Sequence, residues 1–161
     1  MQHNTDIYRD FKGYNAYPVQ EAEKIIRSRF GERIDALLEK INDCVAKAKS
    51  ERRLKTLSEV EKARRRIVRM KNIIEERKMI FVAHYLKEQI TAVDEEKLKI
   101  IDYRVAELIG MSETIISEIA CGETDLHIID KFTKISECFR EMENRCHERA
   151  LLLRRDKQKA P

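Results

Sequence analysis

The sequence predicts an all-α fold, a bundle of long antiparallel helices, from three observations. Only four glycines and two prolines occur in 161 residues, and neither type occurs between Gly31 and Gly110. The strongest helix breakers are therefore missing from a long stretch. Apolar residues recur at spacings of three and four, which places them on one face of a helix. Charged residues make up 39% of the chain, as expected for long helices with solvated faces and facing ion pairs.

Length and composition favour one domain, since 161 residues with 42% hydrophobic content suffice for a single core. We expect an irregular segment over 1–18, a helical domain over 19–153 and a frayed basic tail over 154–161. The amino terminus is polar, and the longest purely apolar run, Met79 to Ala83, is far too short to span a bilayer. These features predict a soluble, cytoplasmic protein. Its four cysteines are then expected to be thiols without disulfide bridges.

The first long helix is predicted over about residues 20–49. One stripe of apolar residues runs along it, and such a stripe is typical of a helix face that packs into a core. The stripe comprises Ile26, Phe30, Ile34, Leu37, Leu38, Ile41 and Val45.

The remaining helices are predicted over about 56–90 and then within about 94–153. Thr56 and Glu59 have the capping-box spacing that starts a helix. Asp94 is a plausible cap for a further helix, which Gly110 can end in the left-handed conformation. A short helix from Ser112 and a last helix from Asp125 to residue 153 complete the bundle.

Charge reverses sharply between two of these helical segments. Residues 47–78 carry thirteen Lys and Arg against five Glu, a net charge of +8, whereas residues 94–130 carry three Lys and Arg against ten Asp and Glu, a net charge of −7. A basic helix can hold phosphate backbones without sequence preference, or it can meet an acidic helix of the same or another chain. Self-association with opposed charges is also expected. The candidate contact residues form a basic stripe, defined as Lys62, Arg65, Arg66, Arg69 and Arg77.

The segment over about residues 102–139 resembles the helix-turn-helix of the Cro and lambda-repressor class, with the motif itself from Val105 to Gly122 and a closing helix from Asp130 to Phe139. That resemblance implies a corner near Gly110 and a DNA-binding regulator with an N-terminal oligomerisation domain. The second helix of the motif, Glu113 to Ala120, contains two carboxylates and no Lys or Arg, an unusual charge for a DNA reader. A DNA-reading helix would expose Ser112, Thr114 and Ser117, whereas a scaffold would bury Ile115, Ile116 and Ile119. In that motif a small residue packs where the two helices cross, here Ala106. A glycine makes the turn, here Gly110, and an apolar residue holds the second helix in place, here Ile116.

The order of segments over about residues 5–120 resembles the helical domain of archaeal GINS subunits, which are scaffold proteins of the replicative helicase. The resemblance is carried by Phe30-Gly31-Glu32-Arg33, by Glu75 to Ile80 on the long basic helix and by Asp94-Glu95-Glu96-Lys97 opening the next one. It implies an accessory subunit of replication or repair machinery. The helix-turn-helix regulator is the alternative.

Neither catalytic nor metal-binding patterns occur in the sequence. Cys138, Cys146 and His147 lie toward one end of the last predicted helix, but no Cys-x-x-Cys or His-x-x-x-His pair accompanies them. A glycine-rich phosphate loop is missing as well. We therefore expect a non-enzymatic protein that uses no cofactor or metal. Its partner would be a second copy or another helical subunit, with DNA as a possible ligand of the basic helix and no membrane or small-molecule substrate.

Overall fold

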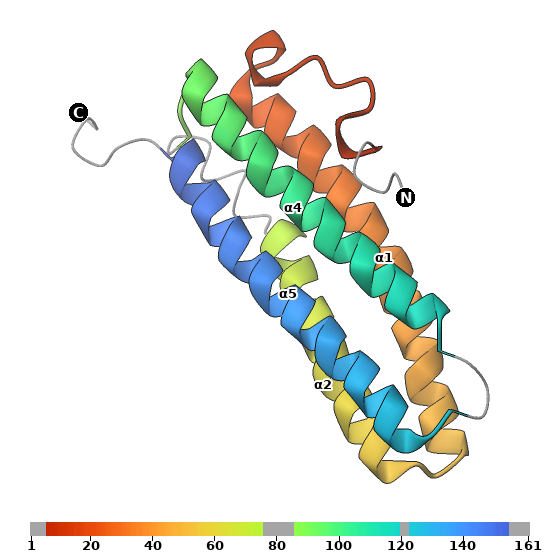
Figure 1. The fold of residues 1–161 in the computed structure, drawn as a ribbon. Helices are drawn as coiled ribbons and strands as arrows, with labels where there is room; N and C mark the ends of the chain where they lie inside the picture. Colours follow the sequence, from red (N-terminus) through yellow and green to blue (C-terminus); the bar gives the residue numbers. More distant parts are fainter. Residues whose placement is uncertain (1–5, 76–85, 120–122, 155–161) are drawn as a thin grey trace.

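The computed structural model describes residues 6–75, 86–119 and 123–154 and contains four long helices in these ranges. Two short 3-10 turns, η1 (Asp6–Tyr8) and η2 (Tyr14–Ala16), precede them. The helices are α1 (Val19–Ser50), α2 (Leu54–Glu75), α4 (Ala92–Ser117) and α5 (Asp125–Leu153). The predicted all-α bundle is confirmed, and Figure 1 shows its elongated shape. No helix in the described ranges is both long and apolar enough to cross a membrane.

The bundle consists of two helical hairpins laid side by side. Each hairpin is antiparallel, α1 with α2 and α4 with α5 (Figure 1). Between the hairpins the neighbours run parallel, so the predicted antiparallel packing applies only within each hairpin. Thr56 contacts Asp125 near the start of both α2 and α5, and Arg69 contacts Glu143 further along both helices. Because α1 and α5 each pack against both α2 and α4, the basic helix α2 and the acidic helix α4 lie diagonally across the bundle.

The spacing of apolar residues explains which face of each helix is buried in the core. Successive buried positions on α2 alternate between four and three residues apart. On α5 the same spacing runs from Ile128 through Phe132, Ile135 and Phe139 to Met142, so one stripe of each helix faces the core. Burying one large apolar side chain stabilises the fold by about 1.5–3 kcal/mol. The buried positions are Thr56, Val60, Ala63, Ile67, Met70 and Ile74 on α2, and Ile128, Phe132, Ile135, Cys138, Phe139, Met142, Arg149 and Leu153 on α5.

Threonine side chains cap the second hairpin. The Thr91 hydroxyl accepts a hydrogen bond from the Asp94 backbone N–H at 3.1 Å, so Thr91 is the N-cap of α4 and the prediction of Asp94 as the cap is wrong. Thr124 caps α5 in the same manner. The predicted start of α5 is confirmed. Thr56 lies inside α2, where its hydroxyl donates to Asp125 Oδ1 at 3.0 Å and joins the starts of α2 and α5.

Two predicted helix boundaries are wrong. The corner at Gly110 is missing, because α4 continues through a buried Gly110 to Ser117 as one helix. The long basic helix was expected to reach about residue 90, but residues 86–91 are not helical. There the Lys87 N–H donates to the Leu153 carbonyl at 2.9 Å, next to a single bridge between Leu86 and Arg154. Residues 76–85 lie outside the described ranges.

Candidate functional site

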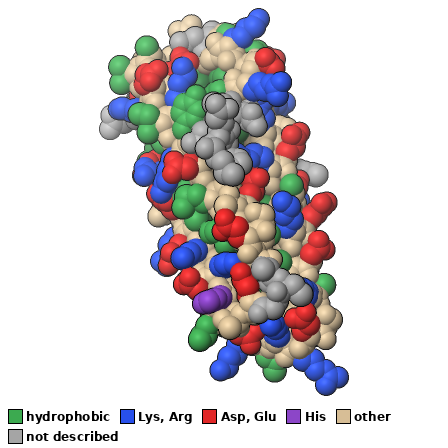
Figure 2. Space-filling view, turned by 45° about the vertical axis from the view of Figure 1, so that its right-hand side comes forward, with side chains coloured by type: hydrophobic (Ala, Val, Ile, Leu, Met, Phe, Trp, Pro, Cys, Tyr) green, Lys and Arg blue, Asp and Glu red, His purple; other side chains and the backbone are tan. Residues whose placement is uncertain are grey.

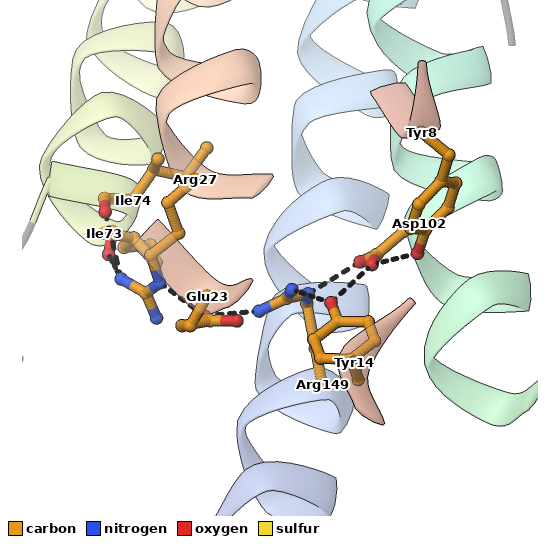
Figure 3. Close-up of polar contacts among 8 residues, drawn as sticks. All are labelled: Tyr8, Tyr14, Glu23, Arg27, Ile73, Ile74, Asp102 and Arg149. Atoms are coloured by element: carbon orange, nitrogen blue, oxygen red, sulfur yellow. Dashed lines mark hydrogen bonds and ion pairs between the residues drawn. The ribbon is translucent and has the colours of Figure 1, made fainter. Parts of the chain in front are cut away.

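A buried ion cluster joins the helices near the end of the bundle where α5 finishes. Arg149 of α5, only 4% exposed, lies between two buried carboxylates, Glu23 of α1 and Asp102 of α4 (Figure 3). Its Nε donates to Asp102 Oδ1 at 2.6 Å, and its Nη1 donates to Glu23 Oε1. Its Nη2 donates to the Tyr14 hydroxyl at 2.6 Å. Three separate acceptors thus hold one guanidinium, which satisfies the pairing that a buried charge requires.

Two tyrosines attach the N-terminal segment to this cluster. The hydroxyls of Tyr8 in η1 and Tyr14 in η2 both donate to Asp102 Oδ2, the latter at 3.1 Å. Phe11, which lies between them in the chain, contacts both tyrosine rings. Burial, and the nearby carboxylate of Asp102, raise the pKa of Tyr8 far above its ordinary value. Burial raises the pKa of Tyr14 as well. Both hydroxyls therefore stay protonated and can keep donating.

Arg27 extends the cluster toward α2. Its Nε donates to Glu23 Oε1 at 2.6 Å, and its Nη1 donates to the carbonyl of Ile74 at 2.9 Å near the end of α2 (Figure 3). Burial opposes the charge of Glu23, but the charges and hydrogen bonds of Arg149 and Arg27 outweigh it, so that the pKa of Glu23 is lowered. Burial also opposes the charge of Arg149, yet the two carboxylates hold its pKa well above the ordinary range. Glu23 and Arg149 are therefore both ionised at neutral pH.

A cleft of about 700 Å³ lies beside the cluster between α1, α2 and α5. Five arginines and one carboxylate, Glu143, are among its described lining residues, together with apolar side chains. Two of the arginines, Arg27 and Arg149, already neutralise the buried carboxylates. Arg69 is paired as well, with Glu143 at 2.7 Å. The cleft can therefore attract an anion mainly through Arg65 and Arg154.

Cys146 also lines this cleft, but its chemistry is that of an inert thiol. Burial raises the pKa of Cys146 to about 11, so the nucleophilic thiolate is scarce at neutral pH. Burial raises the pKa of Cys44 and Cys138 too. Within the described ranges, no group of three or more His, Cys, Asp or Glu side chains is placed to hold a metal ion.

The basic stripe predicted from the sequence lies partly on the outer face of α2. Lys62, Arg65 and Arg69 are exposed there, and Arg66 is half-buried beside them. Lys62 Nζ lies 2.9 Å from Glu59 Oε1, and Arg69 Nη2 lies 2.7 Å from Glu143 Oε1 of α5. Arg65 donates to the backbone carbonyl of Glu61 at 3.3 Å. The remaining member of the stripe, Arg77, lies outside the described residues.

The residues proposed for a helix-turn-helix all lie on the single helix α4. Ser112 is fully buried and donates to the Leu108 carbonyl at 3.0 Å, although a DNA-reading helix required it to be exposed. Thr114 is half-buried and Ser117 is exposed. Without a turn these residues do not form the predicted motif, and that prediction is wrong. Ala106, Gly110 and Ile116 are buried as ordinary core positions, and Ile115 and Ile119 pack against the core.

Sequence reasoning missed the residues of the buried ion cluster. One signal was available: each of the three central charges lies in register with an apolar stripe. Asp102 follows the buried Ile101 directly on α4. On α5, Arg149 comes seven residues after the buried Met142 and four before the buried Leu153, so it faces the same side as both. A charged residue at a core position of a helix predicts a buried partner. The spacing could not identify that partner, because it does not specify which helices are neighbours.

Comparisons with known proteins give no relative from which a role could be transferred. No protein-family model matches the chain, and neither a curated protein nor a solved structure does. The resemblances to GINS subunits and to the Cro class gain no support from them. Only the contacts, burial and charge of this chain then bear on its function.

Proposed function

We propose that this chain is a non-enzymatic helical scaffold subunit that binds an acidic partner protein along α2. The observation that carries the proposal is the outer face of this helix. Between Lys55 and Asn72, every exposed charged residue is a cation, whereas the half-buried Glu59 and Glu61 are the only acidic residues of that range. The whole of α2 carries seven Lys and Arg against three Glu. We call these exposed cations the basic face of α2, and they are Lys55, Lys62, Arg65 and Arg69.

The position of α2 in the bundle supports this proposal. Its basic face cannot be neutralised by the acidic helix α4, because the two helices lie diagonally across the bundle. The cations of its ion pairs are solvent-exposed, Lys62 at 60% and Arg69 at 69%, whereas their carboxylates Glu59 and Glu143 are 25% and 17% exposed. Such pairs contribute about 0–1 kcal/mol each. Because these two cations are mostly in solvent, a partner's carboxylates can contact them while the present acceptors stay paired.

Replication or repair machinery is the setting that we propose for this scaffold. The order of helices that resembles GINS subunits supports it, together with a basic helix suited to acidic partners. A second candidate function uses the same face: the cations at spacings of three and four could bind a nucleic-acid backbone directly, without reading sequence. The regulator with a helix-turn-helix is not proposed again as a sequence reader, because α4 has no turn and Ser112 is buried.

Charge reversal on α2 tests the proposal. The triple variant Arg65→Glu, Arg66→Glu, Arg69→Glu should weaken binding of a fluorescent polyglutamate probe at least about tenfold. Wild-type affinity should fall as salt rises from about 50 to about 200 mM. Anisotropy titrations measure both effects, and circular dichroism checks that the helices persist.

The matched control reverses three exposed lysines of α1, Lys40, Lys47 and Lys49. It changes the net charge equally but leaves the basic face of α2 intact, so affinity should change far less. Equal weakening in both variants would mean that overall charge, and not α2, holds the probe. A duplex DNA probe that binds much more tightly than polyglutamate, with the same dependence on α2, would favour the second candidate.

A further inference from the structure

The outer face of α4 carries large apolar side chains that the bundle leaves in solvent. Val93, Ile100 and Met111 are 65%, 67% and 44% exposed. At 100° per residue these three positions fall within about 20° of one another around the helix. Arg104 and Glu107 occupy the same line between Ile100 and Met111. The result is an exposed stripe on α4, which we call the outer stripe, with apolar ends and a charged centre.

The order of residues along the outer stripe is self-complementary. Read from Ile100, it runs apolar, cationic, anionic, apolar: Ile100, Arg104, Glu107, Met111. We infer that α4 pairs with α4 of a second copy of this chain, antiparallel about a two-fold axis midway between Arg104 and Glu107. Ile100 then lies opposite Met111 of the partner subunit, and Arg104 lies opposite Glu107 of the partner subunit. Both contacts occur twice, as a two-fold interface requires.

Charge complementarity favours a second copy of the chain as the partner of the outer stripe, and it favours the antiparallel direction. A parallel pairing in register would set Glu107 against Glu107 of the partner subunit, which is unfavourable. The antiparallel pairing instead brings Glu107 to a guanidinium. Arg104 Nη1 lies 2.8 Å from Glu107 Oε1 within the chain. Its Nε and Nη2 donate to Glu141 of α5 at 3.1 and 2.8 Å. The exchange between subunits replaces only the Nη1 contact, while Nε and Nη2 keep Glu141 paired, so no charge is left unpaired.

The net negative charge of α4 does not oppose this pairing, because neighbouring cations neutralise its other carboxylates. Glu113 Oε1 lies 2.6 Å from the Arg33 guanidinium of α1, and Asp94 Oδ2 lies 3.3 Å from Lys87 Nζ. Glu96 is near Lys99. On the face drawn in Figure 2, acidic and basic side chains likewise alternate, and hydrophobic side chains reach the surface between them.

The pairing has a consequence for the scaffold. The basic face of α2 lies on the opposite side of the bundle from α4. A dimer built through the outer stripe would therefore present two basic faces, pointing away from each other. Each dimer could hold two acidic partners, and binding to one face would not occlude the other. The dimer itself does not require the basic face, so the two proposals can fail independently.

Light-scattering mass across a concentration series tests the dimer. The wild-type chain should approach twice its 19.1 kDa monomer mass at about 100 μM. The double variant Ile100→Glu, Met111→Glu should raise the dissociation constant at least about a hundredfold and give the monomer mass. Helical circular dichroism should stay unchanged, since both side chains are exposed. The same substitutions at exposed Leu126 and Leu151 of α5 are the matched control and should leave the dimer intact.

A charge swap tests the direction of the pairing. Glu107→Arg sets four cations at the centre of the interface and should weaken the dimer, whereas adding Arg104→Glu restores opposite charges and should recover it. A wild-type monomer at about 100 μM, or an oligomer that persists in the Ile100→Glu, Met111→Glu variant, would overturn the inference. The monomeric variant Ile100→Glu, Met111→Glu should still bind polyglutamate through α2. Loss of the dimer can therefore be told apart from a failure of the proposed function.

Discussion

Arg149 is the residue at which α1, α4, α5 and the N-terminal segment meet in the buried ion cluster. It is 4% exposed and bonded to Glu23, Asp102 and Tyr14. A buried ion pair is not by itself strong evidence of stability, but removing one member leaves the others without compensation. Sequence patterns predicted the buried apolar residues well, because period alone specifies them. They did not predict this cluster, because its members lie far apart in the chain and meet only through the arrangement of the hairpins.

At this position Arg149→Met should lower the free energy of unfolding by about 3–5 kcal/mol, since it leaves two carboxylates buried without a cation. Urea denaturation measures the change. Arg145→Met on the same helix, where the ion pair with Glu148 is partly exposed, is the control and should cost about 0–1 kcal/mol. If the two variants lose the same free energy, the cluster does not stabilise the fold.

Glu23 makes the same cluster sensitive to acid. Burial opposes its charge, but Arg149 and Arg27 outweigh burial and lower its folded-state pKa below the ordinary value of 4.5. A lowered pKa contributes stability that is present above the unfolded-state value and is lost as the pH falls through the folded-state value. Glu23→Gln should therefore flatten the loss of stability below about pH 4.5, by up to about 1.4 kcal/mol per pH unit. Urea denaturation over that range measures the slope, and an unchanged slope would contradict the assignment.

Helix α4 shows why an element can be predicted while its end is not. A glycine within a helix costs about 1 kcal/mol relative to alanine. Burying Ile109 and Ile116 on either side of Gly110 outweighs that cost, so the helix continues. The helices α1 and α5 were predicted to within a residue or two, because long apolar periods and clear starting residues agreed there. The limits of α4 depended on tertiary packing, which the sequence pattern does not contain.

Two glycines in the N-terminal half should respond to alanine with opposite signs. Gly13 has φ +101°, and an added Cβ would lie 2.9 Å from Glu95 Oε1. Gly13→Ala should therefore destabilise the fold by about 1–2 kcal/mol. Gly31 lies within α1 with nothing within 4 Å of an added Cβ, so Gly31→Ala should stabilise by about 0.5–1 kcal/mol. Thermal unfolding ranks the variants, and a loss of stability in Gly31→Ala would contradict the open space seen there.

At the scale of the whole molecule, the diagonal arrangement of α2 and α4 determines what the protein can present to partners. The sequence showed that one helix is basic and another acidic, and it left open whether they meet. In the bundle each packs against α1 and α5 instead. The basic face of α2 and the outer stripe of α4 consequently point to opposite sides. The proposed acidic partner and the proposed second copy would therefore bind on opposite sides.

The most direct test of the proposed scaffold is the location of its binding surface. Backbone amide shifts should be recorded by NMR while polyglutamate is added to the wild-type chain. The largest changes should fall on α2 around Lys62, Arg65 and Arg69, and they should diminish as salt is raised. Changes concentrated on α4, or an absence of changes at low salt, would contradict the claim that the basic face of α2 binds the partner.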